Sequence, residues 1–104
     1  MDVVKKEVES LATKELKNAL KNNPLFHSLH EGYAVILEEV DEVKTELKII
    51  DTNMDCLWNC TKNDDRVFCL SRVQAIKSAA IRAAVESIQV AAMAQKFLDS
   101  EGNF

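Results

Sequence analysis

Glycine and proline are scarce in this chain, with only two glycines and one proline among its 104 residues. β-Sandwiches and barrels need many tight turns, and these two residue types usually make them. Their shortage therefore excludes such folds and favours a small number of long helices.

The sequence also lacks a surplus of basic residues, a long apolar run and an even number of cysteines. A formal net charge of −4 excludes a protein that neutralises the phosphates of a nucleic-acid polymer. No uninterrupted apolar stretch approaches the roughly 20 residues that span a bilayer, and residues 1–7 lack the apolar core of a signal peptide. Three cysteines fit a reducing compartment better than a disulfide framework. We therefore expect a cytoplasmic protein that binds neither membranes nor nucleic-acid polymers.

What the chain does contain is typical of a single folded domain, residues 1–104, with 47% hydrophobic and 29% charged residues. Helical spacing of apolar residues predicts a first helix over about 2–22 and a second over about 28–50. Ser28 is the expected N-cap of the second helix, with Glu31 completing a capping box. We expect this helix to end at 51–53, followed by an ambiguous segment that closes with a turn at 63–65.

The third predicted helix runs from about Asp65 to about Ser100 and is apolar or small nearly all round between Ala75 and Leu98. Such a helix is normally enclosed by other helices, and its many alanines permit close backbone approach. One chain of this length has too few helices to enclose it. The sequence therefore predicts an all-α, antiparallel helical bundle that is completed by homo-oligomerisation, as a homodimer or homotetramer.

Acidic residues form two groups on the second and third predicted helices. Glu39 and Glu42 lie about one turn apart, and Glu39 sits on the shoulder of the apolar stripe. Glu86 and Gln89 lie one turn apart on the third helix. If the two helices pack together, the four side chains can converge and offer the oxygen ligands that suit Mg²⁺ or Mn²⁺. Two simpler readings stay open, because acidic runs usually form solvated faces and Glu86 can pair with Arg82.

The two acidic groups carry a resemblance to a known family. Glu38-Glu39-x-x-Glu42 followed by Glu86-x-x-Gln89 resembles the EExxE…ExxD signature of the MazG-like, all-alpha nucleotide pyrophosphohydrolases. Residues 30–39 and 88–94 are similar to the corresponding runs of small phage and prophage members. The likeness covers residues 28–50 and 75–98, which is slightly under half of the chain.

This resemblance implies Mg²⁺-dependent hydrolysis of a nucleoside triphosphate to the monophosphate and pyrophosphate. By position, Glu39, Glu42 and Glu86 match metal-binding glutamates of the family. Glu38 matches the first glutamate of the motif, and it would have a supporting role or position the attacking water. Metal ions would polarise the phosphates and lower the pKa of that water. On the third helix, Lys77 and Arg82 are candidates for neutralising phosphate charge, although such residues more often serve solubility or ion pairing.

Two features depart from the family pattern. Gln89 stands where the family has an aspartate, and a neutral amide offers the metal an oxygen but no charge. In addition, 43 residues separate Glu42 from Glu86, and residues 53–72 have the character of an insertion. The alternative function is accordingly a non-catalytic helical oligomer, or an interaction protein, that keeps the MazG-like fold.

Several other residues invite functional readings with simpler alternatives. Three cysteines and two histidines suggest zinc, but their spacing is not that of a zinc knuckle, and buried free cysteines are common. Trp58 and Phe68 could stack on a nucleobase, but they could also cover the core or an oligomer interface. A third possibility is that Trp58 and the middle segment form the docking surface of a helical adaptor. Tyr33 lies on the apolar stripe, where we expect it in the core.

Overall fold

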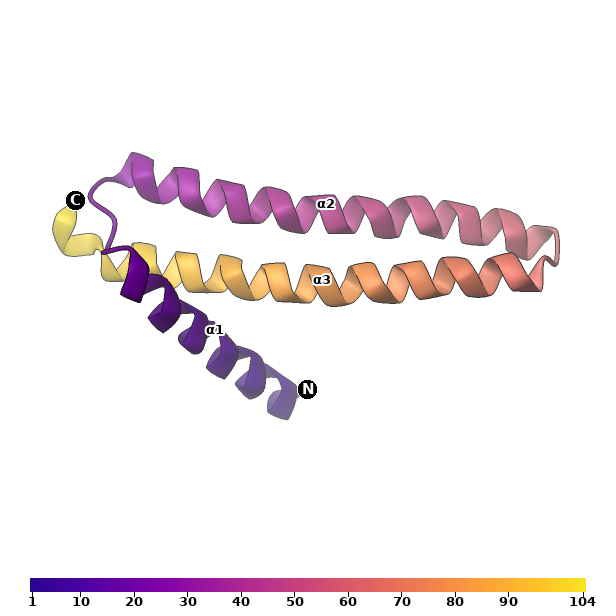
Figure 1. Cartoon of the computed structure of the whole chain (residues 1–104), viewed down its shortest axis with the longest axis horizontal. Coiled ribbons are helices and arrows are strands. Elements are labelled where there is room, and N and C mark those ends of the chain that lie inside the picture. The colour runs from indigo at the N-terminus through magenta and orange to yellow at the C-terminus, as the bar shows by residue number, and fades with distance from the viewer. The chain divides into compact units, whose positions relative to one another are not determined.

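A computed structural model describes all 104 residues and shows an all-helical protein (Figure 1). The three α-helices are α1 (Asp2–Asn22), α2 (Leu29–Lys62) and α3 (Arg66–Asp99), and a short 3-10 helix, η1, covers Glu101–Asn103. The absence of strands confirms the fold class that the shortage of turn residues predicts. None of the helices combines the length and apolar character that crossing a membrane requires.

The bounds of α1 and α3 confirm the predicted ones, but the predicted end of the second helix is wrong. The sequence predicts a stop at 51–53, whereas α2 continues to Lys62. Asn53 is buried, donates from Nδ2 to the carbonyl oxygen of Ile49 at 2.8 Å, and accepts a hydrogen bond from Arg72. Asp, Thr and Asn lower helix stability by only about 0.7 kcal/mol each relative to alanine. The hydrogen bonds of the buried Asn53 side chain outweigh that low helix preference, so α2 continues beyond residues 51–53.

Side chains mark the predicted start of α2 and the predicted turn before α3. Ser28 Oγ accepts a hydrogen bond from the backbone N–H of Glu31 at 3.1 Å, as an N-cap does. At the turn, Asp64 adopts a positive φ of 53°, and Asp65 Oδ1 accepts from the backbone N–H of Phe68 at 3.1 Å. Two short polar side chains thus reverse the chain without glycine.

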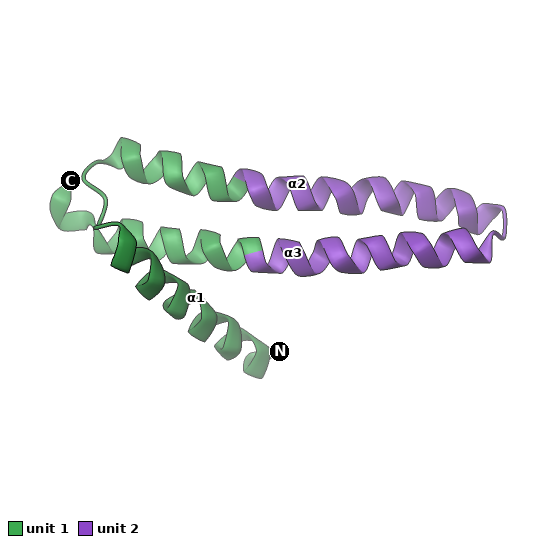
Figure 2. Ribbon diagram, viewed as in Figure 1, with its two compact units in different colours: residues 1–40, 86–104 green, residues 41–85 purple.

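The chain divides into two compact units, which Figure 2 distinguishes by colour. Unit 1 comprises Met1–Val40 and Glu86–Phe104, and unit 2 comprises Asp41–Val85. In unit 1, α1 joins the first part of α2 and the last part of α3 around a small apolar core. Phe26, Ala92 and Met93 are buried there, and five partly buried residues pack against them, namely Leu16, Ala19, Val35, Ile36 and Phe97.

The linker between α1 and α2 is fixed to the end of α3 in unit 1. The backbone N–H of Phe26 donates to Ser100 Oγ at 2.9 Å, and its carbonyl oxygen accepts from Asn103 Nδ2 at 2.9 Å. Phe97 lies so close to Gly32 that an added Cβ would stand 2.7 Å from Phe97 Cε2 and 3.2 Å from Phe26 Cδ2. The lack of a Cβ at residue 32 therefore permits this close approach.

Unit 2 consists of the second part of α2 and the first part of α3, joined by the turn at 63–65. Its buried residues are small or polar: Asn53, Cys60, Ala79 and Ala83. Many large apolar side chains are exposed instead, among them Trp58 at 62% and Phe68 at 45%. Neither aromatic covers a core within this chain, so an oligomer interface or a ligand remains their predicted role. In unit 1, Tyr33 is also exposed, at 64%, so its predicted core position is wrong.

Candidate metal centre

The acidic residues of α2 occupy the face that the helical period predicts. Glu39 and Glu42 are three residues apart in one continuous helix, which puts their side chains on neighbouring turns. Glu39 is half-buried and Glu42 is exposed. Glu86, on α3, is half-buried and belongs to unit 1 together with Glu39.

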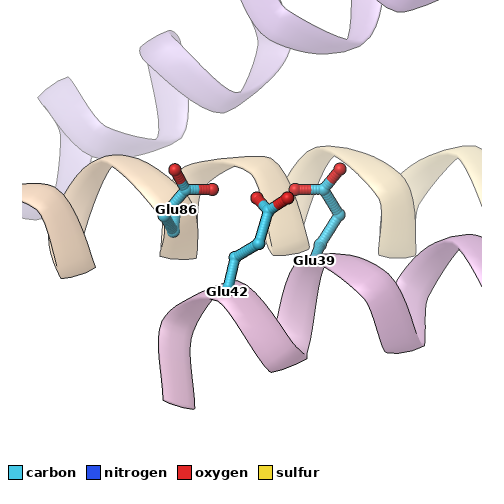
Figure 3. A group of neighbouring side chains, drawn as sticks. All are labelled: Glu39, Glu42 and Glu86. Carbon is cyan, nitrogen blue, oxygen red and sulfur yellow. The ribbon is translucent and has the colours of Figure 1, made fainter. Parts of the chain in front are cut away.

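One carboxylate oxygen from each of these three glutamates lies within 4.8 Å of the other two. Figure 3 shows Glu39 and Glu42 extending from α2 and Glu86 from α3, with their carboxylates close together. Three like charges at this spacing repel one another unless a cation or a proton lies among them. The predicted convergence of Glu39, Glu42 and Glu86 is thus present in the structure.

The donor set fits a small hard cation. Mg²⁺ prefers oxygen ligands at about 2.0–2.1 Å in an octahedron, which places ligand oxygens roughly 3–4 Å apart. Separations within 4.8 Å come close to that range, and the exposed side chain of Glu42 has room to adjust. Three carboxylates with positions left for water or phosphate oxygens suit Mg²⁺ or Mn²⁺ better than a sulfur-loving metal.

Gln89 lies one turn after Glu86 and makes a contact that the sequence did not predict. Its Nε2 donates to Glu15 Oε2 of α1 at 2.8 Å, within unit 1. This bond directs the amide nitrogen toward α1 and leaves the amide oxygen available as an acceptor. A role for Gln89 as a metal ligand stays a prediction. Glu15 did give a sequence signal, because it follows Val8 and Leu11 at intervals that belong to the apolar stripe of the first helix.

Arg82 has a partner on α2 that the sequence does not predict. Its Nε donates to Glu46 Oε2 at 2.8 Å, within unit 2, with the side chains 52% and 16% exposed. An exposed ion pair of this kind contributes only about 0–1 kcal/mol. Glu46 lies one turn after Glu42 on the same helix, but no spacing in the sequence assigns it to Arg82, which is 36 residues away. The guanidinium keeps further N–H groups for a phosphate, so this predicted role is compatible with the pair.

The other two candidates are exposed. Glu38 lies beside Glu39 in sequence but outside the group of three converging oxygens, and Lys77 projects from α3 in unit 2. The role of Glu38 in positioning the water and the role of Lys77 in neutralising phosphate charge stay predictions.

The zinc alternative finds no third ligand. Cys60 and Cys69 face each other in unit 2, but the three glutamates are the one group of three or more metal-ligating side chains that converge. All three cysteines are free thiols.

Comparison with family profiles, with curated proteins and with solved structures finds no match for this chain. The group of three converging glutamates is therefore the feature of this chain that points to a function.

Proposed function

We propose that the chain is a nucleoside triphosphate pyrophosphohydrolase that depends on Mg²⁺ or Mn²⁺ held by Glu39, Glu42 and Glu86. The observation that carries the proposal is the approach of these three carboxylates to within 4.8 Å of one another. The resemblance to the MazG-like EExxE…ExxD signature supports it, since it assigns metal binding to the same three residues.

The bound cation would polarise the phosphates and lower the pKa of a water molecule. The protein's own groups would do the rest. Glu38, exposed next to Glu39, would position that water and accept its proton as the oxygen bonds to phosphorus. The bridging bond between the α- and β-phosphates would break, giving the monophosphate and pyrophosphate. Lys77 and Arg82 would offset the negative charge that develops on the phosphate oxygens.

Gln89 would make this site weaker than one with an aspartate. Its amide lacks charge, and its Nε2 is bonded to Glu15, which holds the side chain toward α1. The variant Gln89→Asp should raise metal affinity, but it would also bring a carboxylate against Glu15. The sharper test is therefore the double variant Gln89→Asp with Glu15→Gln, compared with the wild type. In it the amide introduced at residue 15 can donate to the carboxylate introduced at residue 89.

The test is pyrophosphate release from a panel of dNTPs and NTPs with Mg²⁺ or Mn²⁺. We expect Glu39→Gln, Glu42→Gln and Glu86→Gln each to lower the rate by about 100-fold or more, because each removes a charged ligand. Asp41→Asn is the matched control, since Asp41 is exposed on the same helix outside the group of three. A wild-type protein that releases no more pyrophosphate than Glu39→Gln would overturn the proposal.

A second candidate, a non-catalytic helical oligomer or interaction protein that keeps the MazG-like fold, is favoured by the exposed apolar face of α3. Leu70, Val73, Ile81 and Val85 are 47–66% exposed and fall within one side of the helix at about 100° per residue. A second copy of the chain, as homodimer or homotetramer, would cover this face.

Sedimentation equilibrium and Mn²⁺ titration separate the two candidates. The double variant Ile81→Glu with Val85→Glu should convert an oligomer to a monomer. An oligomer that binds no Mn²⁺ would favour the non-catalytic helical oligomer. Stoichiometric Mn²⁺ binding that Glu42→Gln removes would favour the enzyme.

A further inference from the structure

Two of the three free cysteines face each other across the turn of unit 2. Cys60 lies near the end of α2 and Cys69 near the start of α3, and their sulfur atoms are 2.8 Å apart. A disulfide bond is about 2.05 Å long, so the two sulfurs need to approach by less than about 1 Å to become bonded. The turn at 63–65 is built from polar side-chain and backbone hydrogen bonds, which hold the two helix ends in this register.

The two thiols differ in their access to solvent. Cys69 is half-buried and lines a surface hollow of about 440 Å³ together with Thr61, Asp64 and Arg66. Cys60 is buried, at 4% exposure, and its Sγ donates to the carbonyl oxygen of Leu57 at 3.2 Å. Burial and the hydrogen bond with Cys69 raise the pKa of the Cys60 thiol to about 11. A reagent from solvent therefore meets Cys69 first, while Cys60 stays protonated at neutral pH.

We propose that Cys60 and Cys69 are a redox modification site, forming a reversible disulfide that staples the end of α2 to the start of α3. The proposal is independent of the metal centre. The oxidant class is a small-molecule disulfide such as glutathione disulfide. The hollow beside Cys69 provides its approach and is lined by one positive residue, Arg66, and one negative residue, Asp64.

The exchange proceeds in two balanced steps. The Cys69 thiolate attacks one sulfur of the small disulfide, whose sulfur–sulfur bond breaks and releases one small thiol that takes up the proton lost by Cys69. Cys60 then loses its proton and attacks Cys69 Sγ in the mixed disulfide, which releases the second small thiol. The two protein thiols are oxidised and the small disulfide is reduced to two thiols.

Closing this ring should stabilise unit 2 in particular. The bridge would join residues 60 and 69 and so reduce the conformational entropy of the unfolded chain. Unit 2 buries only small and polar residues, so it has little apolar burial of its own to stabilise it. We expect the oxidised protein to melt about 5–10 °C above the reduced protein.

The experiment equilibrates the full chain in buffers of reduced glutathione and glutathione disulfide, followed by trypsin digestion and mass spectrometry. Cleavage after Lys48, Lys62, Arg66 and Arg72 separates the peptide 49–62 from 67–72, so the proposed bridge appears as these two peptides linked, with two hydrogens lost. Cys56→Ser should retain the link, because Cys56 is the third thiol and lies outside the pair. Cys60→Ser and Cys69→Ser should lose it, and circular dichroism shows whether each variant still folds.

Glutathione retained as a mixed disulfide on Cys69 of the folded protein, with no linked peptides, would overturn the proposal. A link that Cys56→Ser abolishes would overturn it as well, because Cys56 would then be the partner. The melting shift supplies a second measurement: the predicted rise should be absent in Cys69→Ser.

Discussion

Unit 1 and unit 2 use the same two helices but are stabilised in different ways. Unit 1 adds α1 and η1 to them and encloses Phe26, Ala92 and Met93. Its aromatic rings also contact one another, with Phe97 centred 6.4 Å from Phe26 and 5.1 Å from Phe104. Unit 2 has only two helical segments, and its interior contains the hydrogen bond from Arg72 to Asn53 and the thiol pair.

The difference shows what a third helix contributes. Two helices can bury only the narrow strip where they touch, so large apolar residues on the other sides stay exposed. Unit 2 therefore pairs small alanines and polar groups along its contact and leaves Val67, Leu70 and Ile81 uncovered within this chain. Unit 1 has an apolar core of large side chains, whereas the buried residues of unit 2 are small or polar.

The largest expected effect comes from emptying the core of unit 1. Phe26→Ala should lower the free energy of unfolding by about 3–5 kcal/mol, because Phe26 is only 1% exposed and its removal leaves a cavity. Trp58→Ala in unit 2 should change it by less than about 1 kcal/mol in a monomer, since that ring is largely exposed. Urea denaturation at low protein concentration measures both. A large loss for Trp58→Ala would show that another molecule covers unit 2.

A smaller effect should follow from adding one methyl group where α2 meets Phe97. Gly32→Ala would place Cβ 2.7 Å from Phe97 Cε2, and Phe97 cannot move freely between two other rings. Overpacking of this kind costs about 1–3 kcal/mol, partly offset by roughly 1 kcal/mol of helix propensity. We expect a net loss of about 0–2 kcal/mol by urea denaturation. Gly102→Ala is the control, because nothing lies within 4 Å of its added Cβ.

In unit 2, the corresponding test removes a polar contact. Arg72→Ala should lower the free energy of unfolding by about 1–2 kcal/mol, because the buried Oδ1 of Asn53 loses the Nη1–H that it accepts from at 3.0 Å. The double variant Asn53→Leu with Arg72→Ala should recover part of that loss by removing the unpaired polar group. Equal losses in the single and double variants would contradict this account.

The smallest expected effect is a pH dependence that arises in unit 2. The pKa of Cys60 is about 11 in the folded protein against an ordinary 9.0, so as pH rises the unfolded chain loses this proton first. Stability should therefore be intact below about pH 9 and fall between pH 9 and 11. Thermal melts under reducing conditions measure the slope. Cys60→Ser should flatten it, and an unchanged slope would assign the dependence to other groups.

The sequence predicted most of the fold because turn residues and apolar spacing act locally. Ser28 and the turn at 63–65 were identifiable from residue type alone. The continuation of α2 past Asn53 was not, because it depends on Arg72, which lies 19 residues away in sequence and on another helix. Local propensity cannot report such a contact.

The candidate site also has a part that the sequence predicts and a part that it does not. The convergence of Glu39, Glu42 and Glu86 followed from helical period combined with the packing of two helices. The bond from Gln89 to Glu15 spans 74 residues and involves α1, which carries no part of the EExxE…ExxD pattern. Sequence spacing has no means of assigning a partner at that distance, even though Glu15 interrupts an apolar stripe.

The hydrogen bonds of Phe26 to Ser100 and Asn103 also bear on the order in which the chain acquires its structure. During translation, Phe26 emerges more than 70 residues before the two side chains that satisfy its backbone groups. The contacts of unit 2 fall within residues 41–85, so its helical hairpin can assemble while residues 1–40 still wait for their partners. Until Ser100 and Asn103 leave the ribosome, the backbone groups of Phe26 cannot make these two hydrogen bonds, so unit 1 completes its structure only after the residues of unit 2 are available.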